Sequence, residues 1–343
     1  MSIIVALVIF SLIILFHELG HFLLAKRGGI GVTSFSLGMG PAILKKQIGE
    51  TEYALRILPF GGSCAMVGED EASEEENAFN KKGVWTRISV VAAGPIFNFI
   101  LAFVGSVIMI ACIGIDEPVI METMEGYPAY EAGVRAGDEV ISMNGRKIGV
   151  YRDVSMYIQL HQGETIDLVY EREGERFQST IVPKMDEEGY YLMGITGGAY
   201  SKCKNPLELI SYGGKQVGYW IHMVFDSLRM MVSGKVNRED VGGPVRIVGM
   251  IGDTYEQSAQ EGVFAVFINM LNMIVFLSAN LGVMNLLPIP ALDGGRLVFL
   301  LIEAVTGKRV PADKEGYIHL AGFAILMILM VMILFNDISV MFF

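Results

Sequence analysis

The chain alternates between long apolar runs and shorter stretches of mixed charge. A run of about 20 apolar residues is long enough to cross the hydrocarbon core of a bilayer as a helix. Four runs reach that length, and together they predict an α-helical integral membrane protein with four transmembrane helices. The runs lie at residues 1–28, 88–115, 263–290 and 316–335.

The stretch after the first run, residues 29–66, changes to an alternating pattern rich in glycine and β-formers. Residues 47–50 have the composition of a turn, so we expect a β-hairpin or small sheet. It could be a cytoplasmic hairpin, or a sheet that re-enters the membrane where protein or a water-filled cavity covers its backbone. An open strand edge could pair with an extended substrate. Residues 67–87 are expected to form a cytoplasmic loop.

Residues 117–184 mix charges, short β-like runs and turn glycines, which is typical of a compact soluble domain. Residues 127–148 predict a helix, a turn and two strands joined by a tight turn at Asn144 and Gly145. Such a module can accept a peptide as an added strand. Residues 200–262 place apolar side chains in helical clusters interrupted by polar ones. We therefore expect an amphipathic segment on the extracytoplasmic surface rather than a fifth span.

The composition agrees with a membrane protein. Of the 343 residues, 52% are hydrophobic and only 18% are charged, and the mean hydropathy is positive. The net charge of −11 makes nucleic acid an unexpected partner. The three cysteines are far apart, so neither a disulfide framework nor a cysteine metal site is expected. No Lys or Arg precedes the first run, which we interpret as a retained helix rather than a signal peptide.

Basic residues near the ends of the runs predict the orientation of the chain. They follow the first run, precede the second and lie between the third and fourth, whereas acidic residues follow the second run. The loops after the first and third helices should therefore be cytoplasmic. The two termini and the long segment between the second and third helices should lie on the opposite side.

The first run contains three ionisable residues in the pattern His17-Glu18-x-x-His21. Such groups cost about 2.5–3.5 kcal/mol or more at the centre of a bilayer, so residues kept there are expected to be functional. On a helix both imidazoles lie on one face, one turn apart, where they can bind Zn²⁺ with Glu18 as general base. Surface helices can match this pattern by chance, but chance does not explain it inside an apolar span.

Catalytic zinc needs a third protein ligand, and the end of the third run offers Asp293, which follows two prolines and precedes two glycines. It could instead cap a short helix, but beside the histidine motif we favour the ligand. Asn285, on the same broken helix, could donate a hydrogen bond to the substrate backbone or the developing oxyanion, or could join helices. Asn98 could also face the site, although packing is the interpretation we favour.

These residues suit the hydrolysis of a peptide bond. Zinc lowers the pKa of bound water from about 15.7 towards about 7, and Glu18 can take the proton and pass it to the leaving amine. The remaining histidines, His161, His222 and His319, lie in polar or interfacial surroundings. We do not expect them to be ligands.

The chain carries several motifs that occur together: His17-Glu18-Leu19-Gly20-His21, Leu58-Pro59-Phe60-Gly61-Gly62, Gly94-Pro95-x-x-Asn98, Gly242-Gly243-Pro244-Val245 and Asn285-x-x-Pro288-x-Pro290-x-Leu292-Asp293-Gly294-Gly295. As a set they resemble the site-2 protease family, and more closely its bacterial regulator-of-sigma-E protease branch. The resemblance implies an intramembrane zinc metalloprotease with Zn²⁺ on His17, His21 and Asp293 and with Glu18 as the catalytic residue. It also implies a membrane-re-entrant β element at residues 29–66 and one extracytoplasmic PDZ domain at residues 117–184.

The resemblance further implies a multi-pass protein of the bacterial cytoplasmic membrane whose active site faces the cytoplasm. The expected substrates are single-span proteins that another protease has already trimmed, such as anti-sigma factors and signal-peptide remnants. Two other classes remain as alternatives. A metal transporter also places His and Asp in its helices, but it needs no Glu18 between the histidines. A non-catalytic PDZ scaffold would have no reason to keep these residues at membrane depth.

Overall fold

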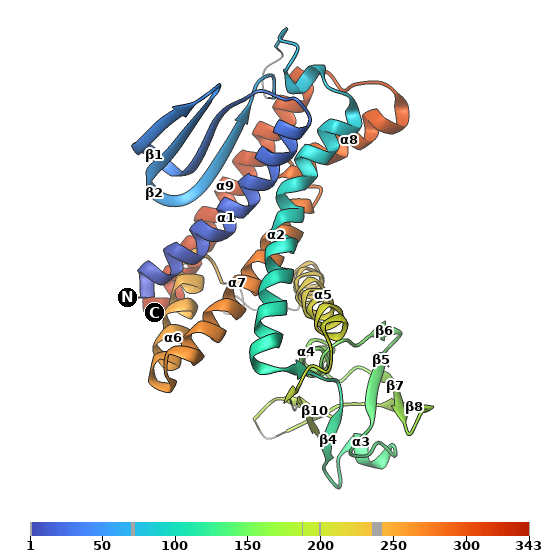
Figure 1. Ribbon diagram of the computed structural model, residues 1–343. Helices are drawn as coiled ribbons and strands as arrows, with labels where there is room; N and C mark the ends of the chain where they lie inside the picture. Colours follow the sequence, from blue (N-terminus) through green and yellow to red (C-terminus); the bar gives the residue numbers. More distant parts are fainter. Residues whose placement is uncertain (1, 70–72, 187, 199, 235–241, 343) are drawn as a thin grey trace. The chain divides into compact units, whose positions relative to one another are not determined.

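The computed structural model describes residues 2–69, 73–186, 188–198, 200–234 and 242–342 (Figure 1). The chain divides into two compact units. The membrane unit comprises residues 1–102 and 236–343, and the β-rich unit comprises residues 103–235. Within the described part of the chain, four helices are long and apolar enough to cross a membrane, which confirms the predicted number of spans by length and composition.

The four candidate spans are α1, α2, α7 and α9, and shorter helices lie between them. Their bounds are α1 (Ser2–Arg27), α2 (Val84–Ile113), α6 (Pro244–Glu261), α7 (Val263–Leu286), α8 (Asp293–Thr306) and α9 (Ala312–Phe342), with a 3₁₀ turn η1 (Phe79–Lys81) before α2. The break predicted after the third run is present, because α7 ends two residues before Pro288 and α8 begins only at Asp293.

Among the described residues, two apolar clusters help to hold the membrane unit together. One joins α1, α6 and α7 through side chains such as Ile13, Ile251 and Leu277. The other joins the end of α1 to α2, α8 and the β-strands, around Ala25 and Val90. Helices α1 and α2 are in close contact, since a Cβ added to Gly20 would lie 2.4 Å from the carbonyl oxygen of Ala93. Only glycine permits that approach.

Residues 29–66 form the predicted hairpin, made of β1 (Val32–Ile48) and β2 (Thr51–Met66) with a turn between them. The register pairs Phe35 with both Cys64 and Tyr53, so the ribbon folds back on itself, as Figure 1 shows. Phe22 of α1 packs against the Phe35 and Tyr53 rings at 5.1 and 6.0 Å. The hairpin therefore lies against α1, the helix that carries the histidines.

The amphipathic segment expected at residues 200–262 forms two helices in different units. Helix α5 (Pro206–Val232) belongs to the β-rich unit, whereas α6 belongs to the membrane unit. Pro244 occupies the first turn of α6, where its missing N–H costs no hydrogen bond. Ile251 of α6 is completely buried in the cluster with α1 and α7. The segment expected at residues 200–262 therefore contains two helices, α5 and α6.

The β-rich unit is built around an antiparallel sheet of order β6-β5-β7-β8. The bounds are β5 (Glu139–Met143), β6 (Arg146–Lys147), β7 (Ile166–Arg172) and β8 (Glu175–Ile181), with α3 (Pro128–Glu131) and α4 (Tyr151–Leu160) contributing to the same core. Asn144 and Gly145 have φ values of 47° and 79°. Both residues have a left-handed backbone conformation, as a tight two-residue hairpin turn requires.

The β-rich unit extends beyond the boundary expected at residue 184. Three short antiparallel strand pairs also belong to this unit: β3 (Ile115–Asp116) with β12 (Tyr200–Ser201), β4 (Ile120–Thr123) with β11 (Ile195–Gly197), and β9 (Lys184–Met185) with β10 (Tyr191–Leu192). Met193 is 1% exposed and belongs to the same core as Met143. Residues after 184 are therefore needed to bury the apolar side chains that precede them.

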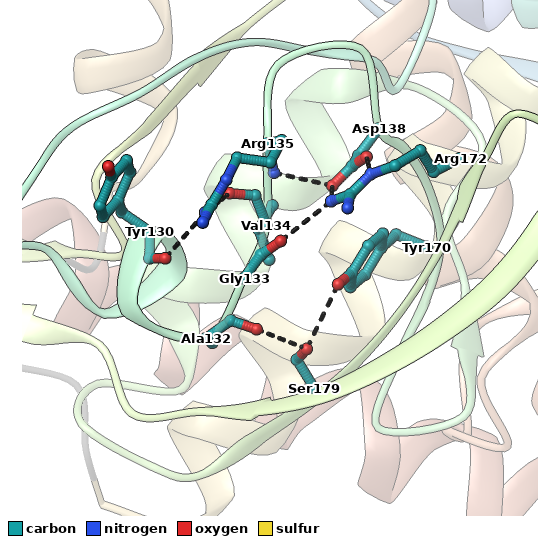
Figure 2. A network of polar contacts seen from close by, with 9 residues as sticks. All are labelled: Tyr130, Ala132, Gly133, Val134, Arg135, Asp138, Tyr170, Arg172 and Ser179. Carbon is teal, nitrogen blue, oxygen red and sulfur yellow. Dashed lines mark hydrogen bonds and ion pairs between the residues drawn. The ribbon is translucent and has the colours of Figure 1, made fainter.

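A buried ion pair fixes the turn after α3 to the sheet (Figure 2). Asp138 has no exposed surface. Its carboxylate accepts hydrogen bonds from Arg172 Nε at 2.6 Å and from the backbone N–H of Arg135 at 2.8 Å. Arg172 also donates to the carbonyl oxygen of Gly133 at 2.9 Å. Such a charge needs these partners, because an unpaired buried carboxylate is strongly destabilising.

Candidate metal centre

Helix α1 presents His17 and His21 on one face, as the four-residue spacing predicts. Both side chains are buried, and their Nε2 atoms lie 3.2 Å apart. The other nitrogen of His21, Nδ1, is 2.9 Å from the carbonyl oxygen of Val90 in α2. The ring of His21 is therefore oriented by the α2 backbone, and its Nε2 atom is directed at the centre.

Asp293, the first residue of α8, completes the cluster. Its Oδ2 atom is 3.2 Å from His17 Nε2 and 3.5 Å from His21 Nε2. Asp293 can approach the histidines of α1 because the two residues that follow it are glycines, which allow close backbone contacts. A Cβ added to Gly294 would lie 2.1 Å from the carbonyl oxygen of Leu287, and one added to Gly295 would lie 2.4 Å from that of Ile289. The Asp-Gly-Gly sequence therefore lets the first turn of α8 pack against the backbone that follows α7.

The donor set fits a zinc ion. One ligand atom from each of His17, His21 and Asp293 lies within 4.8 Å of the others, and two imidazoles with one carboxylate are typical ligands of catalytic zinc. Gly94 of α2 leaves the space, because its Cβ would lie 2.2 Å from His21 Nε2 and 2.7 Å from His17 Cε1. The α2 backbone therefore forms one wall of the cluster without filling it.

Glu18 is half-buried and lines a cavity of about 160 Å³ together with the three candidate ligands. Strand β2 forms another side of this cavity through Cys64. The contact is tight at Gly62, where a Cβ would lie 2.8 Å from Glu18 Cγ. The hairpin that follows α1 thus brings the backbone of β2 against the carboxylate expected to act as general base.

Two asparagines also reach the cluster. The Nδ2 atom of Asn285 is 3.5 Å from His17 Nε2, so the residue lies at the site, as expected from the sequence. Asn98 Nδ2 is 3.2 Å from His17 Nδ1. The packing role favoured for Asn98 is therefore incomplete, because its side chain faces the histidine while its backbone carbonyl accepts from Ser278 Oγ at 3.0 Å.

Arg296 of α8 and Glu69 form an ion pair, and both residues line the cavity of Glu18. Both residues also line a second cavity of about 540 Å³. His319 of α9 lines that second cavity, and its Nδ1 atom accepts a hydrogen bond from the backbone N–H of Ala291 at 2.9 Å. This histidine therefore supports the loop before Asp293, a role that the sequence did not suggest.

The other two histidines lie in the β-rich unit. His161 stacks on Tyr157 with ring centroids 3.9 Å apart, and its Nδ1 atom is 2.9 Å from the Tyr157 carbonyl oxygen. His222 Nδ1 is 3.9 Å from Asp153 Oδ2. Among the residues that the structure describes, the cluster of possible metal ligands comprises only His17, His21 and Asp293.

The fold and the comparisons together establish the class of protein. The four apolar helices make it a multi-pass membrane protein. A model of peptidase family M50 matches residues 5–329, and the chain therefore belongs to that family.

Named relatives agree with this assignment. A Clostridium acetobutylicum protein that carries the provisional name zinc metalloprotease is 40% identical over 338 residues, covering 98% of this chain and 97% of that protein. Zinc metalloprotease RasP of Bacillus licheniformis is 31% identical over 425 residues, covering 99% of each chain. The regulator of sigma-W protease RasP of Bacillus subtilis is 30% identical, again over 425 residues and 99% of each chain. The last two alignments are longer than this chain, so these relatives contain insertions.

Among solved structures, the PDZ domain of an SdrC-like protein from Listeria monocytogenes matches 25% of this chain and 90% of that domain. The identity is 23% and the TM-score is 0.23. That score is too low to compare the two folds.

Proposed function

We propose that this protein is an intramembrane zinc metalloprotease in which His17, His21 and Asp293 hold Zn²⁺. The observation that carries the proposal is the convergence of Asp293 on the two histidines across 272 residues of sequence, with Oδ2 at 3.2 and 3.5 Å from their Nε2 atoms. Membership of peptidase family M50 and the zinc metalloprotease names of its relatives support it.

When bound, zinc would polarise the scissile carbonyl and supply an activated water for hydrolysis. Glu18, whose carboxylate lines the same cavity, would accept a proton from that water and deliver it to the leaving amine. Asn285 would donate a hydrogen bond from its amide to the substrate carbonyl or to the developing oxyanion. Its Nδ2 atom, 3.5 Å from His17 Nε2, is near enough to the centre for this role.

We infer that the substrates are transmembrane segments of single-span proteins already trimmed outside the membrane, including anti-sigma factors and signal-peptide remnants. The name of the Bacillus subtilis relative, regulator of sigma-W protease, supports the anti-sigma class. Among the described residues β2 pairs only with β1, and it passes beside Glu18 at Gly62. An unwound substrate could therefore extend the hairpin as an added strand while its scissile bond lies at the metal.

We further propose that the metal centre opens to the cytoplasm of a bacterial cell and that the β-rich unit is an extracytoplasmic PDZ domain. The basic residues around the loops after α1 and α7 support this orientation, because positive charge is retained on the cytoplasmic side. A folded domain on the far side would exclude substrates that keep a bulky ectodomain, or bind their termini. Residues 29–66 would then be the membrane-re-entrant β region.

The test is to compare Glu18→Gln and Asp293→Ala with the wild-type protein, purified in detergent and supplied with a model transmembrane peptide. We expect E18Q to keep about one zinc per chain but to cleave about 10²–10⁴-fold more slowly, since general-base catalysis contributes that much. D293A should lose both zinc and cleavage. Cleavage by E18Q at the wild-type rate would refute the protease mechanism, and zinc-dependent transport unaffected by E18Q would favour a transporter.

A further inference from the structure

The loop between α7 and α8, residues 287–292, leads directly to the candidate ligand Asp293 and contains a strained residue. Ala291 has a φ value of 76°, in the left-handed region that residues with a Cβ atom rarely adopt. Such a conformation persists only where the surrounding structure holds it, and it is found most often at functional sites. We therefore expect contacts around the loop that keep Ala291 in place.

The backbone N–H groups of the loop show which contact does so. Its two prolines have no N–H group, and Leu287 donates to the last turn of α7. The N–H groups of Ile289 and Leu292 donate to carbonyl oxygens inside the loop, at 2.7 and 3.2 Å. Ala291 instead donates to Nδ1 of His319 in α9, at 2.9 Å. Among the described N–H groups of the loop, the strained residue is thus the one that α9 holds.

The ring of His319 is itself placed by packing between α9, α8 and the loop. Its centroid lies 5.7 Å from that of the Phe299 ring in α8. One turn further along α9, a Cβ added to Gly322 would lie 2.4 Å from Pro290 Cβ and 2.7 Å from the Pro290 carbonyl oxygen. Helix α9 therefore lies directly against the loop, and the accepting nitrogen of the histidine is kept beside the strained residue.

The conformation of Ala291 determines where the carboxylate of Asp293 lies. Only Leu292 separates the two residues. In the left-handed conformation, the Oδ2 atom of Asp293 is 3.2 Å from His17 Nε2 and 3.5 Å from His21 Nε2. A return of φ to its ordinary negative range would turn the residues that follow and carry the carboxylate away from both histidines.

We propose that His319 is a positioning residue for the metal centre, which holds Ala291 in its left-handed conformation and thereby directs Asp293 at the two histidines of α1. The inference rests on the ligand set of the proposed function. It gives α9 a part in the site although none of its described residues belongs to the candidate ligands. The role requires an acceptor at residue 319, but neither a charge nor a bond to the metal there.

The experiment measures the zinc affinity of the purified full-length protein by competition with a chelator. His319→Asn keeps an acceptor oxygen near the position of Nδ1, whereas His319→Phe keeps a ring beside Phe299 and removes both nitrogens. We expect H319N to bind zinc within about threefold of the wild type and H319F to lose about tenfold, since a lost hydrogen bond changes an equilibrium by about that factor. Glu315→Gln is the control, because it removes the charge 3.9 Å from His319 Nε2 but leaves the acceptor; E315Q should keep the wild-type affinity.

A double-mutant cycle separates this role from a general loss of stability. Glycine adopts a positive φ without strain, so Ala291→Gly should make the acceptor less important. We expect H319F to lose less than about threefold in an A291G protein, whereas independent effects would add and leave the tenfold loss unchanged. Equal losses in both backgrounds, H319N as weak as H319F, or H319F with wild-type affinity would overturn the proposal.

If H319F cannot be obtained folded, Ala291→Val decides. The side chain at this position is exposed, so valine adds no buried contact, but a β-branched residue is strongly disfavoured at a positive φ. A291V should lose at least about tenfold in zinc affinity, because the strain at this position rises, and A291G should keep the wild-type affinity. Equal affinity in A291V and A291G would overturn the proposal. A wild-type protein that binds no zinc would instead refute the ligand set.

Discussion

At the residue scale, the metal centre depends on a glycine, Gly94, as much as on the candidate ligands. Gly94 leaves room for both imidazoles, since its Cβ would lie 2.2 Å from His21 Nε2. A contact below 3 Å cannot be accommodated unless the ring moves, and the ring is fixed by its hydrogen bond to Val90. Gly94 therefore belongs to the site although it offers no functional group.

Gly94→Ala should displace the histidines while leaving α2 helical, because alanine favours a helix over glycine by about 1 kcal/mol. We expect zinc affinity to fall by at least about tenfold, as when the surroundings of a metal ligand are disturbed. Competition with a chelator measures the change. Gly249→Ala in α6 is the control, because its Cβ would meet nothing within 4 Å. Equal zinc affinity in the two variants would show that Gly94 does not shape the site.

Some of these residues could be predicted from the sequence and others could not. His17, Glu18 and His21 form a local pattern whose geometry follows from the helical repeat. Asp293 is predictable as a metal ligand because a carboxylate is unusual directly after so long an apolar run. The two prolines that break the helix and the two glycines that follow strengthen this prediction. The contact of Asn98 with His17 joins residues on two different spans, and no local spacing encodes which face of α2 meets α1.

At the scale of elements, the ion pair between Glu69 and Arg296 lines both the cavity of Glu18 and the larger cavity beside it. The two cavities therefore share this ion pair as part of their walls. Cys64 lines the inner cavity and is 9% exposed. With the other two cysteines replaced, the labelling rate of Cys64 reports how easily a reagent in water reaches the cavity of Glu18.

In a Cys112→Ser, Cys203→Ser background, Arg296→Met is expected to speed the reaction of Cys64 with a small water-soluble maleimide. The reason is that the substitution removes the positive charge that holds Glu69, and so breaks the ion pair shared by the two cavities. Glu52→Gln, which breaks an exposed pair with Lys45, is the control and should leave the rate unchanged. If R296M labels no faster than E52Q, the ion pair does not limit access to the inner cavity.

The β-rich unit offers a test of a different element. Arg172→Met would leave Asp138 buried without its main partner, and we expect a loss of about 2 kcal/mol of local stability, since breaking buried pairs costs about 3–5 kcal/mol and Arg172 is partly exposed. Hydrogen exchange of the β7 and β8 amides should then be about 30-fold faster. Arg176→Met removes an exposed pair with Glu171 and should cost less than about 1 kcal/mol. Equal exchange in both variants would contradict the assigned role of Asp138.

The hairpin and the Asn-Gly turn were predictable because alternation and turn chemistry are local signals. The fold-back of the ribbon was not, since it pairs Phe35 with two distant residues at once. The end of the β-rich unit was also missed. Met193 enters the core through strand pairs of two or three residues, which are too short to leave a clear pattern.

At the scale of the whole molecule, the proposed orientation has the loops after α1 and α7 on one side of the membrane and the β-rich unit on the other. In a background in which all three native cysteines, Cys64, Cys112 and Cys203, are replaced by serine, Glu175→Cys should react with a membrane-impermeant maleimide added to intact cells. Lys308→Cys should react only after the cells are permeabilised. Both positions are exposed, so access depends on the membrane alone. The reverse labelling pattern would invert the proposed orientation.

We propose that one zinc ion is held jointly by α1 and the start of α8. X-ray absorption at the zinc edge of the purified wild-type protein tests this binding. We expect two imidazole nitrogens at about 2.0–2.1 Å and carboxylate or water oxygen at about 2.0–2.2 Å, with no sulfur. A sulfur ligand at about 2.3 Å would implicate Cys64, and an unchanged spectrum in Asp293→Ala would remove α8 from the site. Either result would contradict the account.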